Sequence, residues 1–317
     1  MAKVLITGGA GFIGSHITEA YLKKQYEVVV VDDLSSGRLE NLSDVMSNKL
    51  FRFYKTDIRN ADEMEKIFAD EKPDIVSHHA AQKSVPHSID APIEDADKNV
   101  MGLLNVLALV GKYKVKNVLY VSSGGALSKP IIGDEKSRES DYPQIESPYA
   151  VTKFAGENYV KIYSSLYGYK YSILRYANIY GPRQIADGEC GVIPIFVGNV
   201  VANKPSILMT YADMPRGCTR DYVFVGDVVE ANMLLTEKPV NCPVNVGTGI
   251  EVSMMDIYEA ILTVFESTQP IKVTGPRLGD IKRSVLDASR LKNLVGWSPS
   301  VDLVNGLRIL KDSMAKK

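Results

Sequence analysis

Short apolar runs alternate with stretches of helical apolar spacing over residues 3–174. This order predicts a parallel, doubly wound α/β sheet, because each parallel strand needs a crossover helix before the next one. We therefore expect a Rossmann-like fold in this part of the chain. The expected strands lie at residues 3–7, 27–31, 50–53, 74–76, 117–121 and 171–174, and the expected helices at 15–24, 61–71, 96–113 and 149–167.

A glycine-rich turn follows the first expected strand and contains Gly8, Gly11 and Gly14. Because glycine has no side chain, the backbone of such a turn can approach a pyrophosphate at the N-terminus of the next helix. Asp32 ends the second strand, where a carboxylate can accept hydrogen bonds from the adenosine ribose and repels a 2′-phosphate. These residues predict a site for NAD rather than NADP.

Candidate ligand-binding residues also follow later strands. They are Asp57 and Ile58, Ala80 and Ala81, and Ser123. Ligands of a doubly wound sheet bind beyond the carboxyl ends of its strands. We therefore expect these positions to contribute to the same site as the glycine turn.

The alternation stops after about residue 178. A mixed segment leads to a strand at 221–225 and a helix at 227–237, and from Gly247 the chain is irregular apart from a helix at 254–266 and two short helices. This pattern predicts two discontinuous domains. We expect a Rossmann domain for NAD at residues 1–177 plus about 221–246, and a smaller mixed α/β substrate-binding lobe at about 178–220 plus 247–317.

Composition and charge exclude several classes of partner. The 317 residues are 45% hydrophobic and carry 37 basic against 38 acidic side chains, with no run of one sign that would suggest nucleic acid or a membrane surface. The three cysteines and four histidines show no disulfide or metal-ligand spacing. With neither a signal peptide nor a membrane-length apolar run, we expect a cytoplasmic protein without a metal.

Tyr149 and Lys153 are the strongest candidates for chemistry. They are four residues apart on the expected helix, so their side chains lie about one turn apart on one face. A neighbouring ammonium favours the phenolate, and a bound cationic nicotinamide favours it further. Tyr149 is thereby a candidate proton acceptor for a substrate alcohol. The spacing alone is also common on amphipathic helices.

Several motifs, taken together and in order, resemble the extended short-chain dehydrogenase/reductase superfamily, and within it the UDP-hexose 4-epimerases. The resemblance covers nearly the whole chain. The motifs are Thr7 to Gly14, Asp32 to Gly37, Ser147 to Lys153, Leu174 to Arg183, Thr219 to Tyr222, and Arg277 to Asp280.

The resemblance implies a catalytic triad of Ser123, Tyr149 and Lys153. Tyr149 is expected to take the proton from the sugar O4 while the C4 hydride passes to the nicotinamide, and Ser123 to hydrogen-bond O4. Lys153 is expected to bind the nicotinamide ribose and to depress the pKa of Tyr149. The 4-keto sugar then turns over and receives the hydride on its other face, so that NAD acts as a bound, recycled cofactor.

The resemblance also implies contacts to both ligands. Arg220 and Arg277 are expected to clamp the diphosphate of a UDP-sugar, because guanidinium groups fork onto phosphate oxygens. Asn178 is expected to bind the phosphate or the sugar, and Asp280 either the uridine ribose or Arg277. The NAD set also contains Phe12, Ile13, Asp33, Ser35, Ser36, Gly37, Lys83, Asn99 and Tyr176, and the UDP-sugar set also contains Ser84, Val192 and Tyr211.

The residues after Ser123 favour epimerisation over related reactions. Nucleotide-sugar 4,6-dehydratases carry an Asp-Glu pair there and UDP-glucuronate decarboxylases a nearby glutamate, whereas this chain has Gly124-Gly125-Ala126. A UDP-glucuronate 4-epimerase, or another extended short-chain dehydrogenase acting on a nucleotide sugar, is the alternative. A non-catalytic NAD-binding regulatory protein is a remoter one, because such relatives typically lose the tyrosine or the lysine.

Two segments bear on the sugar. The stretch from Ser84 to Ser88 resembles one in epimerases that prefer N-acetylated hexosamines, and Ser284 replaces a bulky tyrosine of glucose-restricted relatives. We therefore expect UDP-GlcNAc and UDP-GalNAc to be accepted alongside UDP-Glc and UDP-Gal. Relatives often have Tyr-Gly at Ser128-Lys129 and Gly-Asp-Gly within the segment from Tyr211 to Gly217, so these two segments depart from the family pattern.

Family members are commonly homodimers through a four-helix interface. Residues 98–113 and 149–167 are expected to supply it here. The apolar candidates for this contact are Val100, Leu103, Leu104, Leu107 and Tyr159, a stripe whose pattern does not differ from that of ordinary core.

Overall fold

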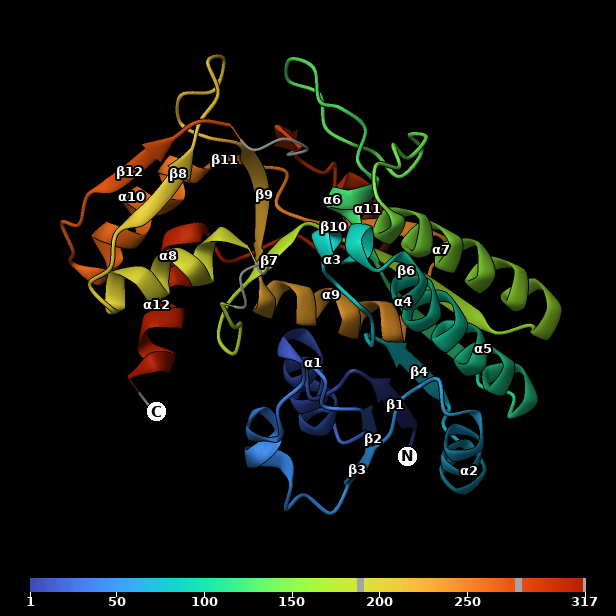
Figure 1. The fold of residues 1–317 in the computed structure, drawn as a ribbon. Helices are drawn as coiled ribbons and strands as arrows, with labels where there is room; N and C mark the ends of the chain where they lie inside the picture. Colours follow the sequence, from blue (N-terminus) through green and yellow to red (C-terminus); the bar gives the residue numbers. More distant parts are fainter. Residues whose placement is uncertain (187–190, 277–280, 316–317) are drawn as a thin grey trace. The chain divides into compact units, whose positions relative to one another are not determined.

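The computed structural model describes residues 1–186, 191–276 and 281–315. Within these ranges a seven-stranded sheet has the order β10-β6-β5-β4-β1-β2-β3 (Figure 1). This parallel, helix-flanked sheet confirms the predicted Rossmann-like fold. Its strands are β1 (Lys3–Thr7), β2 (Glu27–Asp32), β3 (Phe51–Lys55), β4 (Ile75–His78), β5 (Asn117–Ser123), β6 (Lys170–Tyr176) and β10 (Pro243–Val246).

The central strands are buried on both faces. β1 pairs in parallel with β2 on one side and with β4 on the other, so the direction of strand order reverses between β1 and β4. Leu5, Val29 and Val76 have no exposed surface. Continuous apolar strands are typical of a parallel sheet covered by helices on both faces. Ligands of such sheets bind where the strand order reverses.

Helices cover both faces of this sheet (Figure 1). On one face α1 contacts α9 through a 2.6 Å hydrogen bond between Tyr21 and Thr236. On the other face α2, α5 and α7 share one apolar cluster with the strands, which includes Phe68 and Val160. The helices are α1 (Phe12–Lys23), η1 (Leu39–Val45), α2 (Ala61–Glu71), α3 (Val85–Asp90), α4 (Pro92–Ala96), η2 (Asp97–Met101), α5 (Gly102–Lys112), α6 (Gly124–Leu127), α7 (Pro148–Tyr167) and α9 (Val225–Glu237).

Three features differ from the sequence predictions. α1 begins at Phe12, before the expected start at residue 15, because Gly11 already takes the N-cap position. The single helix expected at 96–113 is instead α4, the π-helical segment η2 and α5, and Asn99 lies in the π-helical segment. Leu103 and Leu107, expected at a dimer interface, have no exposed surface within this chain. Apolar spacing in the sequence does not show at which residue a helix begins, whether it contains a π-helical segment, or whether an apolar side chain lies in the core or at an interface.

The other part of the chain forms a mixed sheet around β9. This strand pairs antiparallel with β11 and parallel with β13 and β7, while β8 and β12 form a separate parallel pair. Residues 221–224, expected in the Rossmann domain, thus belong to β9 of the mixed sheet, and Val225 begins α9. The elements are β7 (Asn178–Tyr180), α8 (Val192–Val201), β8 (Ser206–Met209), β9 (Thr219–Phe224), β11 (Glu251–Ser253), α10 (Met254–Phe265), β12 (Ile271–Thr274), β13 (Arg283–Ser284), α11 (Ser289–Val295) and α12 (Leu303–Met314).

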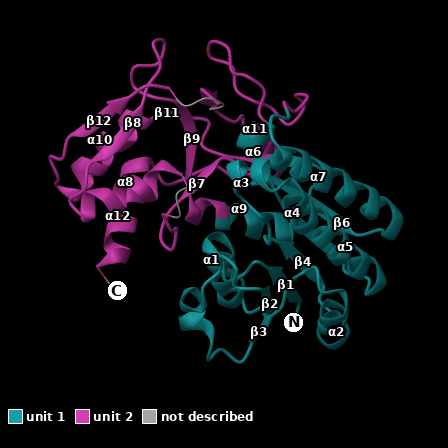
Figure 2. Ribbon diagram, viewed as in Figure 1, with its two compact units in different colours: residues 1–127, 145–175, 229–244 teal, residues 128–144, 176–228, 245–317 magenta. Residues whose placement is uncertain are grey.

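The chain divides into two compact units (Figure 2). Unit 1 contains residues 1–127, 145–175 and 229–244, and unit 2 contains residues 128–144, 176–228 and 245–317. Residues 128–144 and 221–228 therefore group with unit 2, although the sequence analysis assigned them to the Rossmann domain. The assignment of NAD and of the nucleotide sugar to separate domains stays a prediction. None of the helices in the described ranges has the length and apolar character that a membrane span needs.

Candidate active site

The turn between β1 and α1 has the shape of a phosphate-binding turn. Gly8 has a φ of 71°, and a Cβ atom there would lie 2.7 Å from the backbone nitrogen of Ala80. A Cβ atom at Gly14 would lie 2.2 Å from the carbonyl oxygen of Gly8, so the helix packs directly on the turn. α1 has no side-chain cap and no acidic residue in its first turn, which leaves its positive end open to an anion. This turn fits the pyrophosphate of NAD. The other predicted contacts at this turn are Gly11, Phe12 and Ile13.

Asp32 ends β2 with its carboxylate beside the same turn. The backbone N–H groups of Ala10 and Leu34 donate to its two oxygens, each at 2.9 Å. Burial raises the pKa of Asp32, and these two hydrogen bonds oppose the rise. A Cβ atom at Gly37 would lie 2.6 Å from the Asp32 Oδ1 atom, so only glycine lets the following loop pass this close.

Other residues predicted on the adenosine side lie in the loops after β2 and β3. Asp33 accepts hydrogen bonds from the backbone and the hydroxyl of Ser35 at 2.9 and 2.7 Å. Asp57 forms an ion pair with Arg59 at 2.6 Å, which lowers the pKa of Asp57. Its carboxylate is thus already bound within the protein. Of the remaining two predicted residues, Ser36 is exposed and Ile58 is buried in the core.

Asn99 ties the loop after β4 to the π-helical segment. Its Oδ1 accepts from the backbone N–H of Gln82 at 2.8 Å, and its Nδ2 donates to the Gln82 carbonyl at 3.0 Å. The side-chain amide of Asn99 therefore forms the two hydrogen bonds with the Gln82 backbone that a neighbouring β-strand would form. Ser84 in the same loop caps α3 by accepting from the N–H of His87 at 3.0 Å. The predicted residues Ala81 and Lys83 also lie in this loop, partly buried and exposed respectively.

Ser123, Tyr149 and Lys153 come together in unit 1. Ser123 ends β5, and its side chain forms a hydrogen bond with that of Tyr149. Lys153 follows Tyr149 by one turn of α7, and its Nζ lies 5.8 Å from the centre of the tyrosine ring. The same ammonium donates to the carbonyl of Val121 at 3.0 Å. The predicted triad is therefore assembled at the carboxyl end of a strand that belongs to the same sheet as the glycine turn.

Burial controls the protonation of this cluster. It raises the pKa of Tyr149 to about 12, against the hydrogen bond from Ser123, and Asp95 adds to the rise. Burial also lowers the pKa of Lys153 to about 8, and the carboxylates of Asp95 and Glu157 oppose this. In the protein chain alone Tyr149 is thus a neutral phenol at pH 7. The sequence analysis expected Lys153 to depress this pKa, but in the chain alone desolvation of the phenolate dominates, and the influence that opposes it is the hydrogen bond from Ser123.

The adjacent histidines lie at the end of β4: His78 is its last residue and is buried, and His79 follows it and is partly buried. His78 shares a hydrogen bond with Thr7 at 2.9 Å, and His79 shares one with Ser77 at 2.8 Å. Burial lowers the pKa of each to about 3, so both are neutral at pH 7. Across residues 1–186, 191–276 and 281–315, no group of histidine, cysteine and acidic side chains could hold a metal ion.

Three predicted sugar-site residues lie on neighbouring strands of unit 2. Ser284 on β13 is the register partner of Arg220 on β9, and Asn178 on β7 pairs with Tyr222 of β9. The Arg220 guanidinium donates to the carbonyl of Thr219 at 2.8 Å. The side chain of Ser284 is buried. The sheet thus brings Arg220 and Ser284 directly beside each other.

The remaining residues predicted to bind ligands are spread over unit 2. Tyr211 forms an isolated bridge with Met214, and the Lys282 ammonium lies 5.1 Å from the centre of the Tyr211 ring. Val192 begins α8, and Tyr176 is buried at the end of β6. The two predicted residues Arg277 and Asp280 lie outside the described residues.

One departure from the family pattern lies beside Ser284. The Ser128 hydroxyl is 3.5 Å from the Ser284 hydroxyl, and both side chains are buried. The neighbouring Lys129 forms an ion pair with Glu135 at 3.0 Å. The replacement of Tyr-Gly by Ser128-Lys129 therefore places a second small side chain against Ser284.

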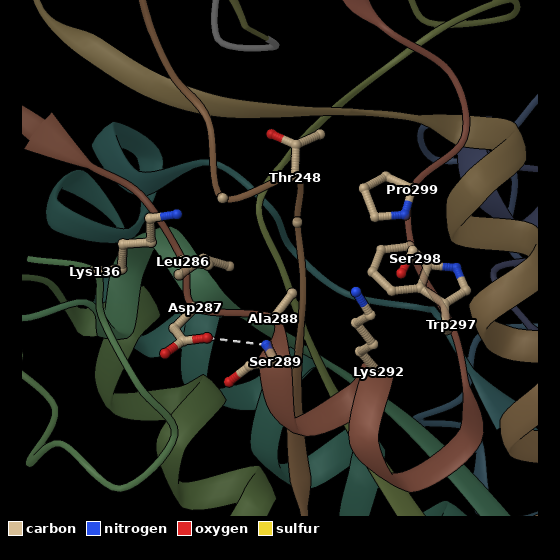
Figure 3. Close-up of a pocket in the computed structure, with 12 residues that line it drawn as sticks. Lys136, Thr248, Leu286, Asp287, Ala288, Ser289, Lys292, Trp297, Ser298 and Pro299 are labelled. Atoms are coloured by element: carbon tan, nitrogen blue, oxygen red, sulfur yellow. Dashed lines mark hydrogen bonds between the residues drawn. The ribbon is translucent and has the colours of Figure 1, made fainter.

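Unit 2 also contains a pocket of about 230 Å³ (Figure 3). Lys136, Lys292 and Trp297 are among the residues that line it. Asp287 is held by a 2.9 Å hydrogen bond from the backbone N–H of Ser289. None of the residues predicted to bind NAD or a nucleotide sugar lines this pocket. It is therefore separate from the predicted contacts.

The sequence analysis missed several residues that support the triad. The backbone N–H of Tyr149 donates to the buried Ser88 hydroxyl at 3.2 Å. Asp95 accepts a hydrogen bond from Thr152, the residue before Lys153, at 2.8 Å. In the sequence, Asp95 stands four residues before Asn99, which places the two side chains on the same face of a helix. This spacing was the available indication that Asp95 lies near the predicted site. On a helix, however, that spacing does not distinguish a buried carboxylate from a solvated one.

Comparison with known proteins identifies the family. A model of the NAD dependent epimerase/dehydratase family matches residues 4–247. The UDP-glucose 4-epimerase of Mycolicibacterium smegmatis is 38% identical over 314 residues, which cover 96% of each chain.

Solved structures agree in fold and in sequence. The UDP-glucose 4-epimerase of Thermotoga maritima, crystallised with UDP-glucose, has a TM-score of 0.92 and 37% identity, covering 99% of each chain. The UDP-N-acetylglucosamine 4-epimerase of Methanobrevibacter ruminantium, in complex with UDP-N-acetylmuramic acid, has a TM-score of 0.91 and 32% identity, covering 99% of this chain and 98% of that one. With its glycine turn and triad, the chain therefore belongs to the NAD dependent epimerase/dehydratase family, and it is an NAD-dependent isomerase related to the UDP-hexose 4-epimerases.

Proposed function

We propose that the protein interconverts the C4 epimers of UDP-hexoses and keeps NAD bound between turnovers. We further propose that it accepts UDP-GlcNAc and UDP-GalNAc as well as UDP-Glc and UDP-Gal. The observation that carries the proposal is the hydrogen-bonded pair Ser123 and Tyr149, with Lys153 one turn away, in the sheet that carries the glycine turn. An alcohol placed beside this pair can lose its proton to the tyrosine.

The residues of the chain divide the work of proton transfer. NAD, when bound, would supply the hydride acceptor and donor for C4 of the sugar. Tyr149 removes the proton from O4 and later gives it back, while Ser123 donates a hydrogen bond to the phenolate. Because burial holds Tyr149 neutral in the chain alone, this step depends on positive charge from Lys153 and from the oxidised nicotinamide.

The segment after Ser123 supports epimerisation over dehydration. Gly124 to Leu127 form the short helix α6, and the Ser123 hydroxyl accepts from the N–H of Ala126 at 3.2 Å. Neither a carboxylate nor another acid stands in this helix. Elimination of water from a 4-keto sugar needs an acid and a base near C5 and C6, whereas epimerisation needs none beyond the triad.

We assign the nucleotide sugar mainly to unit 2. Arg220 presents a guanidinium group beside Ser284 on paired strands, which suits a diphosphate and the sugar attached to it. Ser284 and Ser128 are both small, and this favours room for an N-acetyl group. We assign NAD to unit 1 because this unit contains the glycine turn and Asp32.

We also propose a cytoplasmic homodimer formed through helices of unit 1. Large apolar side chains are exposed on α7 and its neighbours, at Met101, Val151, Ile162 and Leu166. Pairing these helices with those of a second copy would cover this surface in a four-helix arrangement.

The proposal is tested by incubating the purified protein with UDP-GlcNAc or UDP-Glc and no added NAD. We expect both sugars to approach equilibrium with their C4 epimers, as measured by anion-exchange chromatography or proton NMR. Conversion of UDP-Glc alone would overturn the acceptance of N-acetylated sugars and keep the mechanism. If neither sugar is converted while NAD is released on denaturation, the 4-epimerase proposal fails for these substrates and UDP-glucuronate becomes the next one to test.

A further inference from the structure

Asp95 on α4 is a buried carboxylate beside the catalytic helix, and its side chain has no exposed surface. Its Oδ1 accepts from the Gln82 amide at 2.7 Å and from the Asn99 amide at 3.0 Å. Its Oδ2 accepts from the Thr152 hydroxyl at 2.8 Å. One carboxylate therefore joins the loop after β4, the π-helical segment and α7.

Every donor to Asp95 is neutral. No basic side chain forms an ion pair with it in the part of the chain that the structure describes. Glu157 on α7 is also a buried carboxylate, but it forms an ion pair with Arg175 at 2.7 Å. A buried carboxylate without such a partner has no cation to cancel its charge. In surroundings of low polarity, its electric field therefore acts on nearby groups with little screening.

The field of Asp95 reaches the catalytic pair. Among charged groups, Asp95 has the largest influence on both Tyr149 and Lys153, and it raises the pKa of each. Glu157 acts on Lys153 more weakly. The other titratable groups around the pair are neutral or balanced: His78, His79 and Tyr120 are uncharged at pH 7, and Arg175 balances Glu157.

We propose that Asp95 is a positioning residue for the triad: it holds α7 against the loop after β4, and its negative charge favours the protonated forms of Lys153 and Tyr149. The position is enforced through Thr152, which precedes Lys153, through Gln82 in the loop after β4, and through Asn99, a predicted NAD contact. The part of this proposal that concerns turnover rests on the proposed 4-epimerisation.

The first test is the pH dependence of kcat in Asp95→Asn. The asparagine keeps the shape: its Oδ1 can accept from Gln82 and Asn99, and its Nδ2 can donate to the Thr152 hydroxyl. The proton of that hydroxyl can turn to the Tyr149 carbonyl, already 3.0 Å away. Loss of the charge lowers the pKa of both Tyr149 and Lys153, so we expect both limbs of the profile to move to lower pH by about half a unit or more.

Thr152→Val is the matched control. It removes one hydrogen bond to Asp95 and keeps the charge, so its profile should stay at the pH of the parent protein. If Asp95→Asn does not fold, Asp95→Ser removes the same charge and leaves space for a water molecule between Gln82 and Asn99. A neutral variant at position 95 whose profile keeps the parent's position would overturn the electrostatic role.

The second test needs no turnover. Melting temperatures are measured at pH 7 for the parent, Asp95→Asn, Lys153→Met and the double variant, both stripped of NAD and at saturating NAD. If the two charges interact, the change on Asp95→Asn is more favourable with methionine at position 153 than with lysine, by about 2 °C or more. Additive changes would overturn the coupling. If the parent protein has no 4-epimerase activity, the proposed function is wrong, but the melting temperatures still test the coupling between Asp95 and Lys153.

Discussion

Arg175 donates two hydrogen bonds of 2.7 Å to Glu157, from Nε to Oε1 and from Nη2 to Oε2. The pair lies inside unit 1, and Glu157 follows Lys153 by one turn of α7. Ser122, the neighbour of Ser123, donates to the same carboxylate at 2.7 Å. Glu157 therefore links the helix that carries Tyr149 and Lys153 to β6 through Arg175, and to the strand that ends in Ser123 through Ser122.

Breaking this pair from one side should cost more than removing it altogether. Arg175→Met leaves the buried Glu157 without a cation, and we expect the free energy of unfolding to fall by about 3–5 kcal/mol. In the double variant Glu157→Leu/Arg175→Met no charge remains, so the loss should be clearly smaller. Urea denaturation followed by circular dichroism measures both. An equal or larger loss in the double variant would show that packing dominates over the unpaired charge.

Tyr149→Phe should abolish most of the activity without affecting the fold. It removes the group that accepts the O4 proton, and we expect kcat to fall by about 10²–10⁴-fold. Tyr159→Phe removes a hydroxyl from the same helix at a half-buried position outside the site, and it should keep the parent kcat. NAD bound to each purified variant is measured after denaturation. A comparable fall of kcat in both variants would contradict the assignment of Tyr149.

The sequence was most informative where the chain repeats one physical pattern. Strand, glycine turn and helix around Gly8 to Gly14 predict the NAD turn, and the spacing of Tyr149 and Lys153 places both on one face of α7. The sequence was least informative for contacts between distant segments. The pairing of Arg220 with Ser284 depends on strand register, and the π-helical segment around Asn99 comes with the side-chain pairing of Asn99 and Gln82. The apolar periodicity of the sequence contains neither.

The surroundings of buried charged groups also could not be predicted from the sequence. The expected effect of Lys153 on Tyr149 follows from their spacing, but the observed pKa of Tyr149 follows from how completely the folded protein excludes water from it. Asp95 and Glu157 look alike in the sequence as helical carboxylates. The structure separates them, because Arg175 reaches Glu157 alone.

Acid should destabilise the protein through its adjacent histidines. His78 and His79 have folded-state pKa values of about 3, below the unfolded value of about 6.5, so the unfolded chain binds more protons between these limits. Their contribution to stability is complete above pH 6.5 and is lost as the pH falls toward 3. At pH 5 each histidine should cost about 2 kcal/mol.

Denaturation at pH 7 and pH 5 measures this effect. His79→Gln can keep a hydrogen bond with Ser77 but does not titrate, so it should lose less stability between the two pH values than the parent does. His87→Gln, a matched change at a partly buried histidine outside the core whose ring contacts Glu94, should lose at least as much as the parent. The same pH slope in all three proteins would exclude His79 as a source of acid lability.

The size of the side chain at position 284 should select the sugar. Ser284→Tyr places a large ring where Ser284 and Ser128 now face each other, so we expect kcat/KM for UDP-GlcNAc to fall by at least about tenfold relative to UDP-Glc. Ser284→Ala is the control, because it removes the hydroxyl and stays small, and it should keep both substrates. Coupled assays with the two sugars give the ratio. An unchanged ratio in Ser284→Tyr would show that this position does not limit the sugar.

A charge on the exposed face of α7 should separate the subunits of the proposed dimer. Ile162 is 53% exposed on this helix and lies on the same helix as the exposed Val151 and Leu166. Ile162→Glu would place a carboxylate in an interface that excludes water, so the protein should elute as a monomer in size-exclusion chromatography with light scattering. Ile207→Glu on β8 of unit 2 starts from a similar exposure of 55% and should leave the mass unchanged. Dissociation by Ile207→Glu and not by Ile162→Glu would move the interface to unit 2, and a monomeric parent protein would remove the dimer altogether.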